Sequence, residues 1–198
     1  MPTVTDETIE RAARAVDGGE LVVYPTETVY GLAADALDTD AVGSVFAAKG
    51  RDRSDPISMA VPDVQAVRQY TRPSEREQQF MRAFLPGPVT VVLEGKPMVP
   101  DVLTAGNERV GIRIPDHEVA LALAERAGPI TATSANVSGT GSVRRVEELD
   151  GAIRDTAAVV LDGGETPGGG STVVDAEHGE IYRRGALADE VDAWLAGH

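Results

Sequence analysis

Polar side chains suited to binding a ligand gather just after the first apolar segment of the chain. The apolar run at 21–24 is followed by Pro25, which cannot donate a hydrogen bond to a neighbouring strand, so the strand is expected to end there. Thr26, Glu27 and Thr28 then form a loop at the strand end, where ligands of α/β proteins tend to bind. A turn in which the hydroxyls bond their own backbone is the alternative.

A second segment, KGRDRSDP, concentrates positive charge at the end of a predicted helix. It contains Lys49, Arg51 and Arg53. The helix dipole explains one cation at a helix C-terminus, worth about 0.3–1 kcal/mol, but not three. Arginine binds phosphate or carboxylate with two parallel hydrogen bonds, and lysine adds a compact charge, so the segment suits a triphosphate or an amino-acid carboxylate. A solvated basic turn that pairs with acidic surface residues is the alternative.

Two further features suit anions. TATSANVSGTGS, at residues 131–142, ends a predicted strand in small hydroxyl and amide side chains with glycines, so its backbone N–H groups can approach an anion, although a plain Gly/Ser turn would look the same. The chain has no P-loop spacing. Arg113, in VGIRIP, lies on the opposite strand face from its isoleucine neighbours and therefore faces a cleft or solvent. The adjacent Arg183 and Arg184 point to opposite faces and pose the same choice.

The composition excludes several kinds of chemistry. The chain has no cysteine, and none of its three histidines lies in a metal-ligand or triad pattern, so we expect no protein-held metal and no nucleophilic triad. Its net charge of −14 argues against a general nucleic-acid binder, because such affinity rests on phosphate neutralisation. The acidic, lysine-poor composition is typical of a salt-adapted, halophilic cytoplasm. Any chemistry must rest on positioning and on arginine and lysine charges.

Helix-like and strand-like segments alternate early and strands cluster late, which predicts a mixed α/β sheet. No linker divides the chain, so one domain over residues 1–198 is expected. The glycine-rich segment 162–171 is predicted to be a surface loop. No apolar run or basic, hydrophobic leader indicates membrane insertion or export, so a cytoplasmic protein is expected. The predicted helices cover 6–17, 39–49, 61–70, 73–85, 116–128, 143–153 and 188–196, and the predicted strands cover 21–24, 56–61, 88–94, 109–115, 129–134, 157–164, 171–176 and 180–185.

Five motifs in this order, YPTETVYGL, KGR, VGIRIP, TSANVSG and STVVD, resemble the threonylcarbamoyl-AMP synthase family, the YrdC-like proteins. The resemblance covers residues from about 8 to 187. It implies a single-domain twisted mixed sheet, flanked by helices and curved around a concave basic cavity, without the extra C-terminal domain of longer relatives. It also implies a nucleotidyltransferase that makes threonylcarbamoyl-AMP from L-threonine, bicarbonate and ATP, with Mg²⁺, as the first step of threonylcarbamoyladenosine formation at position 37 of tRNA.

The resemblance also implies site residues. Thr28, Arg113 and Ser171 are similar to the family's threonine contacts, and Arg113 suits the carboxylate. The residues that correspond to its nucleotide contacts are Lys49, Arg51, Asp55, Ser134, Asn136, Ser142 and Arg183, with Lys49 and Arg51 as the catalytic cations. A downstream tRNA-modifying complex is the implied partner, and no tight direct RNA binding is expected.

Two positions depart from the family pattern. Asp55 stands where the family often has asparagine, and Ala60 where it often has histidine. An aspartate near phosphates is unfavourable unless it serves Mg²⁺ or points away, so the pocket is expected to differ in detail. A non-catalytic RNA-binding module and a paralogue with another nucleotide-dependent activity are the alternatives. The acidic charge disfavours the first, and the intact PTET, KGR and SAN motifs disfavour the second.

Overall fold

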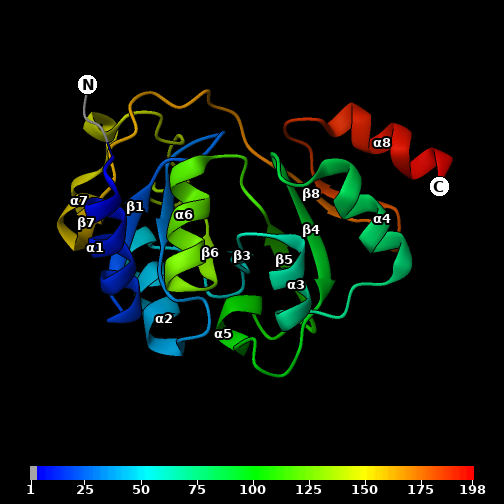
Figure 1. Ribbon diagram of the computed structural model, residues 1–198, viewed down its shortest axis with the longest axis horizontal. Coiled ribbons are helices and arrows are strands. Elements are labelled where there is room, and N and C mark those ends of the chain that lie inside the picture. The colour runs from blue at the N-terminus through cyan, green and yellow to red at the C-terminus, as the bar shows by residue number, and fades with distance from the viewer. Residues whose placement is uncertain (1–3) are drawn as a thin grey trace.

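A computed structural model describes residues 4–198 and shows a mixed α/β architecture with helices packed against twisted sheets (Figure 1). The larger sheet has the strand order β6-β3-β5-β4-β8-β9, and the smaller one has the order β2-β1-β7. The strands are β1 Leu21–Tyr24, β2 Gly31–Ala33, β3 Ser58–Ala60, β4 Val89–Glu94, β5 Arg109–Arg113, β6 Ile130–Ala132, β7 Ala157–Val160, β8 Thr172–Asp175 and β9 Glu180–Arg183. Parallel and antiparallel pairs occur in both sheets, so the predicted mixed α/β fold is confirmed.

Backbone hydrogen bonds connect the two sheets through β2 and the segment around β6. Leu32 N donates to Thr133 O at 2.8 Å, and Thr131 N donates to Ala34 O at 2.9 Å. A bridge between Gly31 and Ser134 continues the contact. The strand-end loop after β1 and the loop after β6 are therefore held beside the larger sheet.

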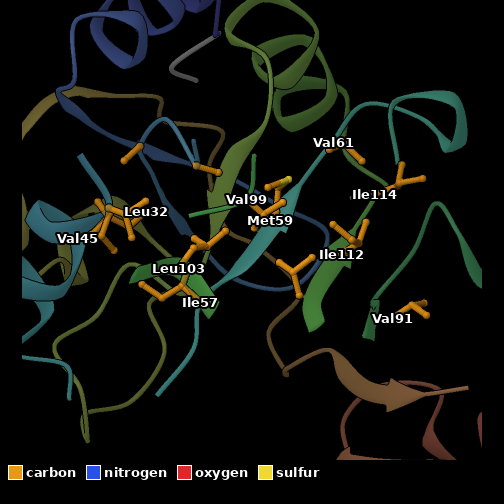
Figure 2. Packing of buried hydrophobic residues seen from close by; sticks show 14 of the residues in the cluster. Leu32, Val45, Ile57, Met59, Val61, Val91, Val99, Leu103, Ile112 and Ile114 are labelled. Atoms are coloured by element: carbon orange, nitrogen blue, oxygen red, sulfur yellow. The ribbon is translucent and has the colours of Figure 1, made fainter. Parts of the chain in front are cut away.

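Alternation along β5 gives the larger sheet two different faces. Val110 and Ile112 are buried in the main core, where Figure 2 shows Ile112 near Met59. Arg109, Gly111 and Arg113 point to the opposite face, because side chains alternate along a strand. One face of the sheet thus builds the core, and the other is free to build a site.

Most of the helices lie close to the ranges predicted for them. The helices are α1 Asp6–Asp17, α2 Thr39–Lys49, α3 Val64–Tyr70, α4 Glu75–Phe84, α5 Asp101–Thr104, α6 Glu118–Ala127, α7 Gly151–Thr156 and α8 Ala188–Gly197, with a 3₁₀ turn at Val146–Glu148. Helices α1 and α6 lie side by side (Figure 1) and share a second apolar cluster with β1. At the other end, Phe80 of α4 packs edge-on against Trp194 of α8, with ring centroids 5.0 Å apart.

Helix α2 places the basic segment beside the sheet. Its N-cap is Asp38, whose carboxylate accepts from Asp40 N and Ala41 N. Gly50 ends the helix in the left-handed conformation at φ 56°, which glycine adopts without strain. Lys49 therefore lies in the last turn, as predicted.

Three details differ from the sequence-based prediction. Strand β2 and helix α5 were not predicted, and the helix expected over 143–153 is divided into the 3₁₀ turn and α7.

In the described part of the chain, no helix combines the length and apolar character that crossing a membrane requires.

Candidate functional site

The free face of the larger sheet forms the floor of a cavity of about 980 Å³. Adjacent strands supply the floor side chains, and the loops after β1, α2 and β6, together with residues 169–171, supply the walls. Gly111 keeps the floor open, because a Cβ atom there would lie 2.4 Å from Ser58 Oγ and 3.0 Å from Thr90 Cγ2. The floor residues are Ser58, Ala60, Thr90, Val92, Gly111 and Val173.

Arg113 and the loop after β1 form one end of the cavity. The Arg113 Nη2 group donates to Thr28 Oγ1 at 2.9 Å. It also lies 2.8 Å from Glu27 Oε1, an ion pair in which both side chains are largely buried. Glu27 does not line the cavity, so it holds Arg113 from behind while Thr28 lies in the wall. A guanidinium fixed in this way suits a carboxylate ligand.

The two explanations offered for the PTET loop apply to different residues. Thr26 makes the turn: its Oγ1 donates to Val29 O at 2.6 Å and accepts from Val29 N at 3.2 Å. Thr28 is buried and uses its hydroxyl with Thr26 and Arg113. Turn chemistry at Thr26 therefore presents Thr28 to the cavity.

Arg51 and Asp55 lie in the wall formed after α2. The Arg51 Nε and Nη2 groups donate to the backbone carbonyls of Asp55 and Pro56 at 3.1 and 3.0 Å, which fold the loop back on the guanidinium. Asp55 is exposed, and its carbonyl rather than its carboxylate contacts Arg51. Its acidic side chain thus remains available at the cavity rim.

Ser171 and Arg183 meet in another part of the cavity wall. Arg183 Nη2 donates to Ser171 Oγ at 2.8 Å, and Arg183 Nε donates to Ser171 O at 3.0 Å. Thr90 Oγ1 lies 3.0 Å from the same Ser171 hydroxyl. Ser171 therefore connects the floor to Arg183. Arg184, the residue after β9, pairs with Asp189 and Asp192 at the surface.

Lys49 and Asn136 lie behind the cavity wall. Lys49 is 1% exposed, and its Nζ donates to Asn136 O at 2.7 Å and also to Ser134 O. The Asn136 amide donates to Val137 O and Thr140 O. Neither side chain is among the cavity-lining residues of 4–198, whereas Ser134 and Ser142 are. Lys49 thus holds the backbone of the loop that carries Ser134, and its predicted contact with a nucleotide stays a prediction.

The electrostatics of the cavity differ from those of the whole chain. Burial lowers the pKa of Arg183, and the nearby charges of Arg113 and Arg51 lower it further. Burial, with a smaller contribution from Arg51, lowers the pKa of Lys49 to about 8. Clustered cations favour an anionic ligand, although the chain carries a net charge of −14.

Sequence reasoning missed the tyrosines that support this region. Tyr24 is 2% exposed and lies opposite Gly31 in the sheet. A Cβ atom on Gly31 would lie 2.7 Å from the Tyr24 ring, so the glycine in the YG pair makes room for that ring. Tyr30 is fully buried and donates to Gly164 O at 2.7 Å. The tyrosine and glycine were visible in the sequence, but their contact depends on strand pairing.

The glycine-rich segment 162–171 was predicted to be a surface loop. In the structure, part of it lines the cavity. Gly168 N donates to Thr28 O at 2.7 Å. Glu165 pairs with Arg144 at 2.8 Å and with Arg145 at 2.5 Å. These contacts hold the segment beside the PTET loop, so that Gly169, Gly170 and Ser171 reach the wall.

Known proteins share this chain's sequence and fold. The Sua5/YciO/YrdC family model, described as telomere recombination, matches residues 14–185. A Bacillus subtilis threonylcarbamoyl-AMP synthase is 41% identical over 168 residues, which are 83% of this chain and 48% of that protein. A putative threonylcarbamoyl-AMP synthase of Mycobacterium tuberculosis H37Rv is 36% identical over 194 residues, or 96% and 89% of the two chains.

A solved structure is similar to this chain in both sequence and fold. P. abyssi Sua5 complexed with L-threonine is 36% identical and superposes with a TM-score of 0.86 over 94% of this chain and 56% of that one. This chain therefore spans about half the length of the first curated relatives that it matches.

Proposed function

The chain belongs to the Sua5/YciO/YrdC family, and from this premise we propose that it synthesises L-threonylcarbamoyl-AMP from L-threonine, bicarbonate and ATP and releases pyrophosphate. The observation that carries the proposal is the convergence of Arg51, Arg113 and Arg183 on one cavity that also presents Thr28 and Ser171. The names of the curated relatives support the activity, and the threonine complex of P. abyssi Sua5 supports the amino-acid substrate.

Threonine would bind at the Arg113 end. The guanidinium is oriented by Glu27 and Thr28 and suits the amino-acid carboxylate. Ser171, held between Thr90 and Arg183, offers a hydroxyl at the adjoining wall. These contacts would leave the threonine amine directed toward the middle of the cavity, where the carbamate must form.

ATP would bind along the walls that carry Arg51 and Arg183. Their charges, with the Ser134 and Ser142 side chains, would contact the phosphates. In this structure Lys49 and Asn136 organise the backbone of the Ser134 loop and do not line the cavity. We assign them a positioning role in the geometry described here.

The reaction needs alignment more than a general base. The threonine amine and bicarbonate form a carbamate with loss of water, and a carbamate oxygen then attacks the α-phosphorus. A new P–O bond forms as the bond to the β-phosphate oxygen breaks, and the electron pair leaves with pyrophosphate. The nucleophile is already anionic, so fixed guanidinium groups contribute by holding the two anions together and neutralising developing charge.

Magnesium would enter as a complex with ATP and is not expected to occupy a protein-built cage. Within residues 4–198, no three His, Cys, Asp or Glu side chains are placed to hold a metal. Mg²⁺ often binds through one or two carboxylates together with substrate phosphates, and the exposed Asp55 carboxylate in the wall fits that role. The bound ion would supply charge neutralisation on the pyrophosphate leaving group.

The product is a reactive mixed anhydride, so an acceptor must use it soon after release. We propose that a tRNA-modifying complex takes the threonylcarbamoyl group for adenosine 37 of tRNA. Direct RNA binding by this chain is not required for the step. A tight, salt-sensitive RNA complex in a gel-shift titration would favour the RNA-binding alternative instead.

Pyrophosphate release tests the proposal. Purified protein with MgATP is expected to release pyrophosphate only when threonine and bicarbonate are both present. Serine and buffer depleted of bicarbonate serve as controls. Equal release without threonine would contradict the proposal.

A further inference from the structure

A β-bulge in β9 brings an unassigned aromatic side chain to the cavity. Val173 pairs with Arg183, whereas the next residue, Val174, pairs with Ile181, so Tyr182 has no partner across the strand pair. In a regular strand Tyr182 and Arg183 would point to opposite faces. The extra residue at the bulge changes the direction in which the side chains point, so both Tyr182 and Arg183 line the cavity.

The Tyr182 ring is exposed but not free. It is 58% exposed, the largest value among the exposed hydrophobic residues described, while its hydroxyl donates to Asp175 Oδ2 at 3.3 Å. Asp175 is buried and is fixed in turn by Arg109 Nη2 at 3.2 Å and by the backbone N–H of His178 at 3.0 Å. The ring is therefore presented at the cavity rim in a defined position.

The strand order shows where Tyr182 lies relative to the proposed threonine site. Arg113 is on β5 and contacts Thr28, whereas Tyr182 is on β9, and β4 and β8 lie between these two strands. At about 4.8 Å between neighbouring strands, β9 is separated from β5 by about 14 Å across the sheet. Tyr182 thus lies on the β9 side of the cavity, away from Arg113 and Thr28.

The surroundings of Tyr182 suit a flat, weakly polar group. Val92 and Val173 lie on neighbouring strands and form an apolar part of the cavity floor. Three aromatic rings line the cavity within residues 4–198, and the other two, Tyr24 and Tyr30, are buried. Tyr182 therefore presents the exposed aromatic surface of the cavity. Arg183, next along the strand, is placed to contact a phosphate of the same ligand.

We propose that the adenine base of ATP stacks on Tyr182, above the floor formed by Val92 and Val173. This inference rests on the proposed function, because it takes ATP as the nucleotide. It assigns the triphosphate to the arginine-lined middle of the cavity and the base to the β9 side. Stacking on an aromatic ring accepts any base but favours the larger purine surface, so Tyr182 also contributes a preference for ATP over CTP.

Calorimetric titration of nucleotides without threonine tests the assignment independently of turnover. Tyr182→Ala is expected to weaken ATP binding about 5- to 150-fold, which corresponds to about 1–3 kcal/mol, and to reduce the preference for ATP over CTP. Inorganic tripolyphosphate should bind the variant within about twofold of wild type. Tyr182→Phe keeps the ring and should retain ATP affinity within about threefold, whereas Tyr182→Leu keeps bulk without the ring and should lose it.

Met98→Ala is the matched control, since Met98 is also an exposed hydrophobic side chain but does not line the cavity. ATP affinity within twofold of wild type in both Tyr182→Ala and Tyr182→Leu would overturn the inference. An equal loss for ATP and tripolyphosphate would also overturn it, because it would place Tyr182 at the phosphates. Normal stacking behaviour in a protein that releases no pyrophosphate would instead contradict the proposed function and leave the base site intact.

Discussion

Replacing Lys49 and Arg51 one at a time distinguishes a cation that supports the fold of the site from one that contacts the ligand. Lys49 is buried and donates to the carbonyls of Ser134 and Asn136. Arg51, two residues later, lines the cavity and donates to two carbonyls of its own loop. Replacing each with methionine keeps an unbranched side chain and removes the charge. We expect Lys49→Met to destabilise the fold and Arg51→Met to abolish turnover with little loss of stability.

The magnitude for Lys49 follows from two opposing effects. Two hydrogen bonds from a charged donor contribute about 1.5–3 kcal/mol each, so their loss costs about 3–6 kcal/mol. Keeping an ammonium group buried costs stability, and the fall of its pKa from 10.5 to about 8 corresponds to about 3 kcal/mol at neutral pH. The net loss on replacement is therefore at most about 3 kcal/mol at pH 7. For Arg51, whose loop is exposed, we expect less than about 1 kcal/mol.

The pH dependence of stability gives a second signature of Lys49. Its pKa is lower in the folded chain than in the unfolded chain, so the unfolded chain binds more protons between these two values. Wild-type stability should gain from this group as the pH rises from about 8 to about 10.5, and Lys49→Met should lack that gain.

Urea unfolding at several pH values, with pyrophosphate release measured on the same preparations, checks both expectations. The reasoning would be refuted if Lys49→Met unfolded like wild type at every pH and yet failed to bind ATP. That result would mean that the ammonium group contacts the ligand and not the Ser134 loop.

Three further predictions concern the floor and the two ends of the cavity. Arg113→Lys should raise the KM for threonine at least about tenfold and leave ATP affinity unchanged, because lysine lacks the planar fork; steady-state kinetics with each substrate varied would show it, and an unchanged threonine KM would argue against the assignment. Gly111→Ala should abolish turnover because its Cβ atom would meet Ser58 Oγ at 2.4 Å, and adding Ser58→Ala should restore part of the activity; a fully active single variant would show that the floor can yield. Asp175→Asn should cost about 2–3 kcal/mol in urea unfolding at pH 7, less than for a fully buried pair because Arg109 is partly exposed. Burial alone would raise the Asp175 pKa, but hydrogen bonds from His178 and the Arg109 charge lower it overall, so this stabilisation should disappear as the pH falls below about 4, and a constant difference down to pH 2 would contradict it.

The sequence predicted those parts of the fold that local patterns encode. The helix predicted over 6–17 and the alternation that sets Arg113 opposite its isoleucine neighbours in β5 both appear in the structure. Strand β2 was missed because Gly31–Ala33 is short and lacks β-branched residues, so it is a strand only through its pairing with β1. Helix α5 is four residues long and carries too little periodicity to detect.

The site was predictable as a set of residues but not as an arrangement. Eight of the ten predicted side chains line the cavity, and their motifs were visible because each lies in a loop or at a strand end. The buried position of Lys49 depends on how the end of α2 packs beneath the loop after β6. The re-aiming of Tyr182 depends on a bulge, which is a property of strand register. Neither follows from local sequence.

Mass spectrometry of the nucleotide product tests the central claim most directly. The protein is incubated with MgATP, threonine and ¹³C-bicarbonate, and the adenylate formed is identified by mass. The account predicts one product that contains AMP, threonine and a single ¹³C carbon, and its formation should be lost in Arg51→Met. Formation of ADP instead, or of AMP with no labelled threonine adduct at any time point, would contradict it.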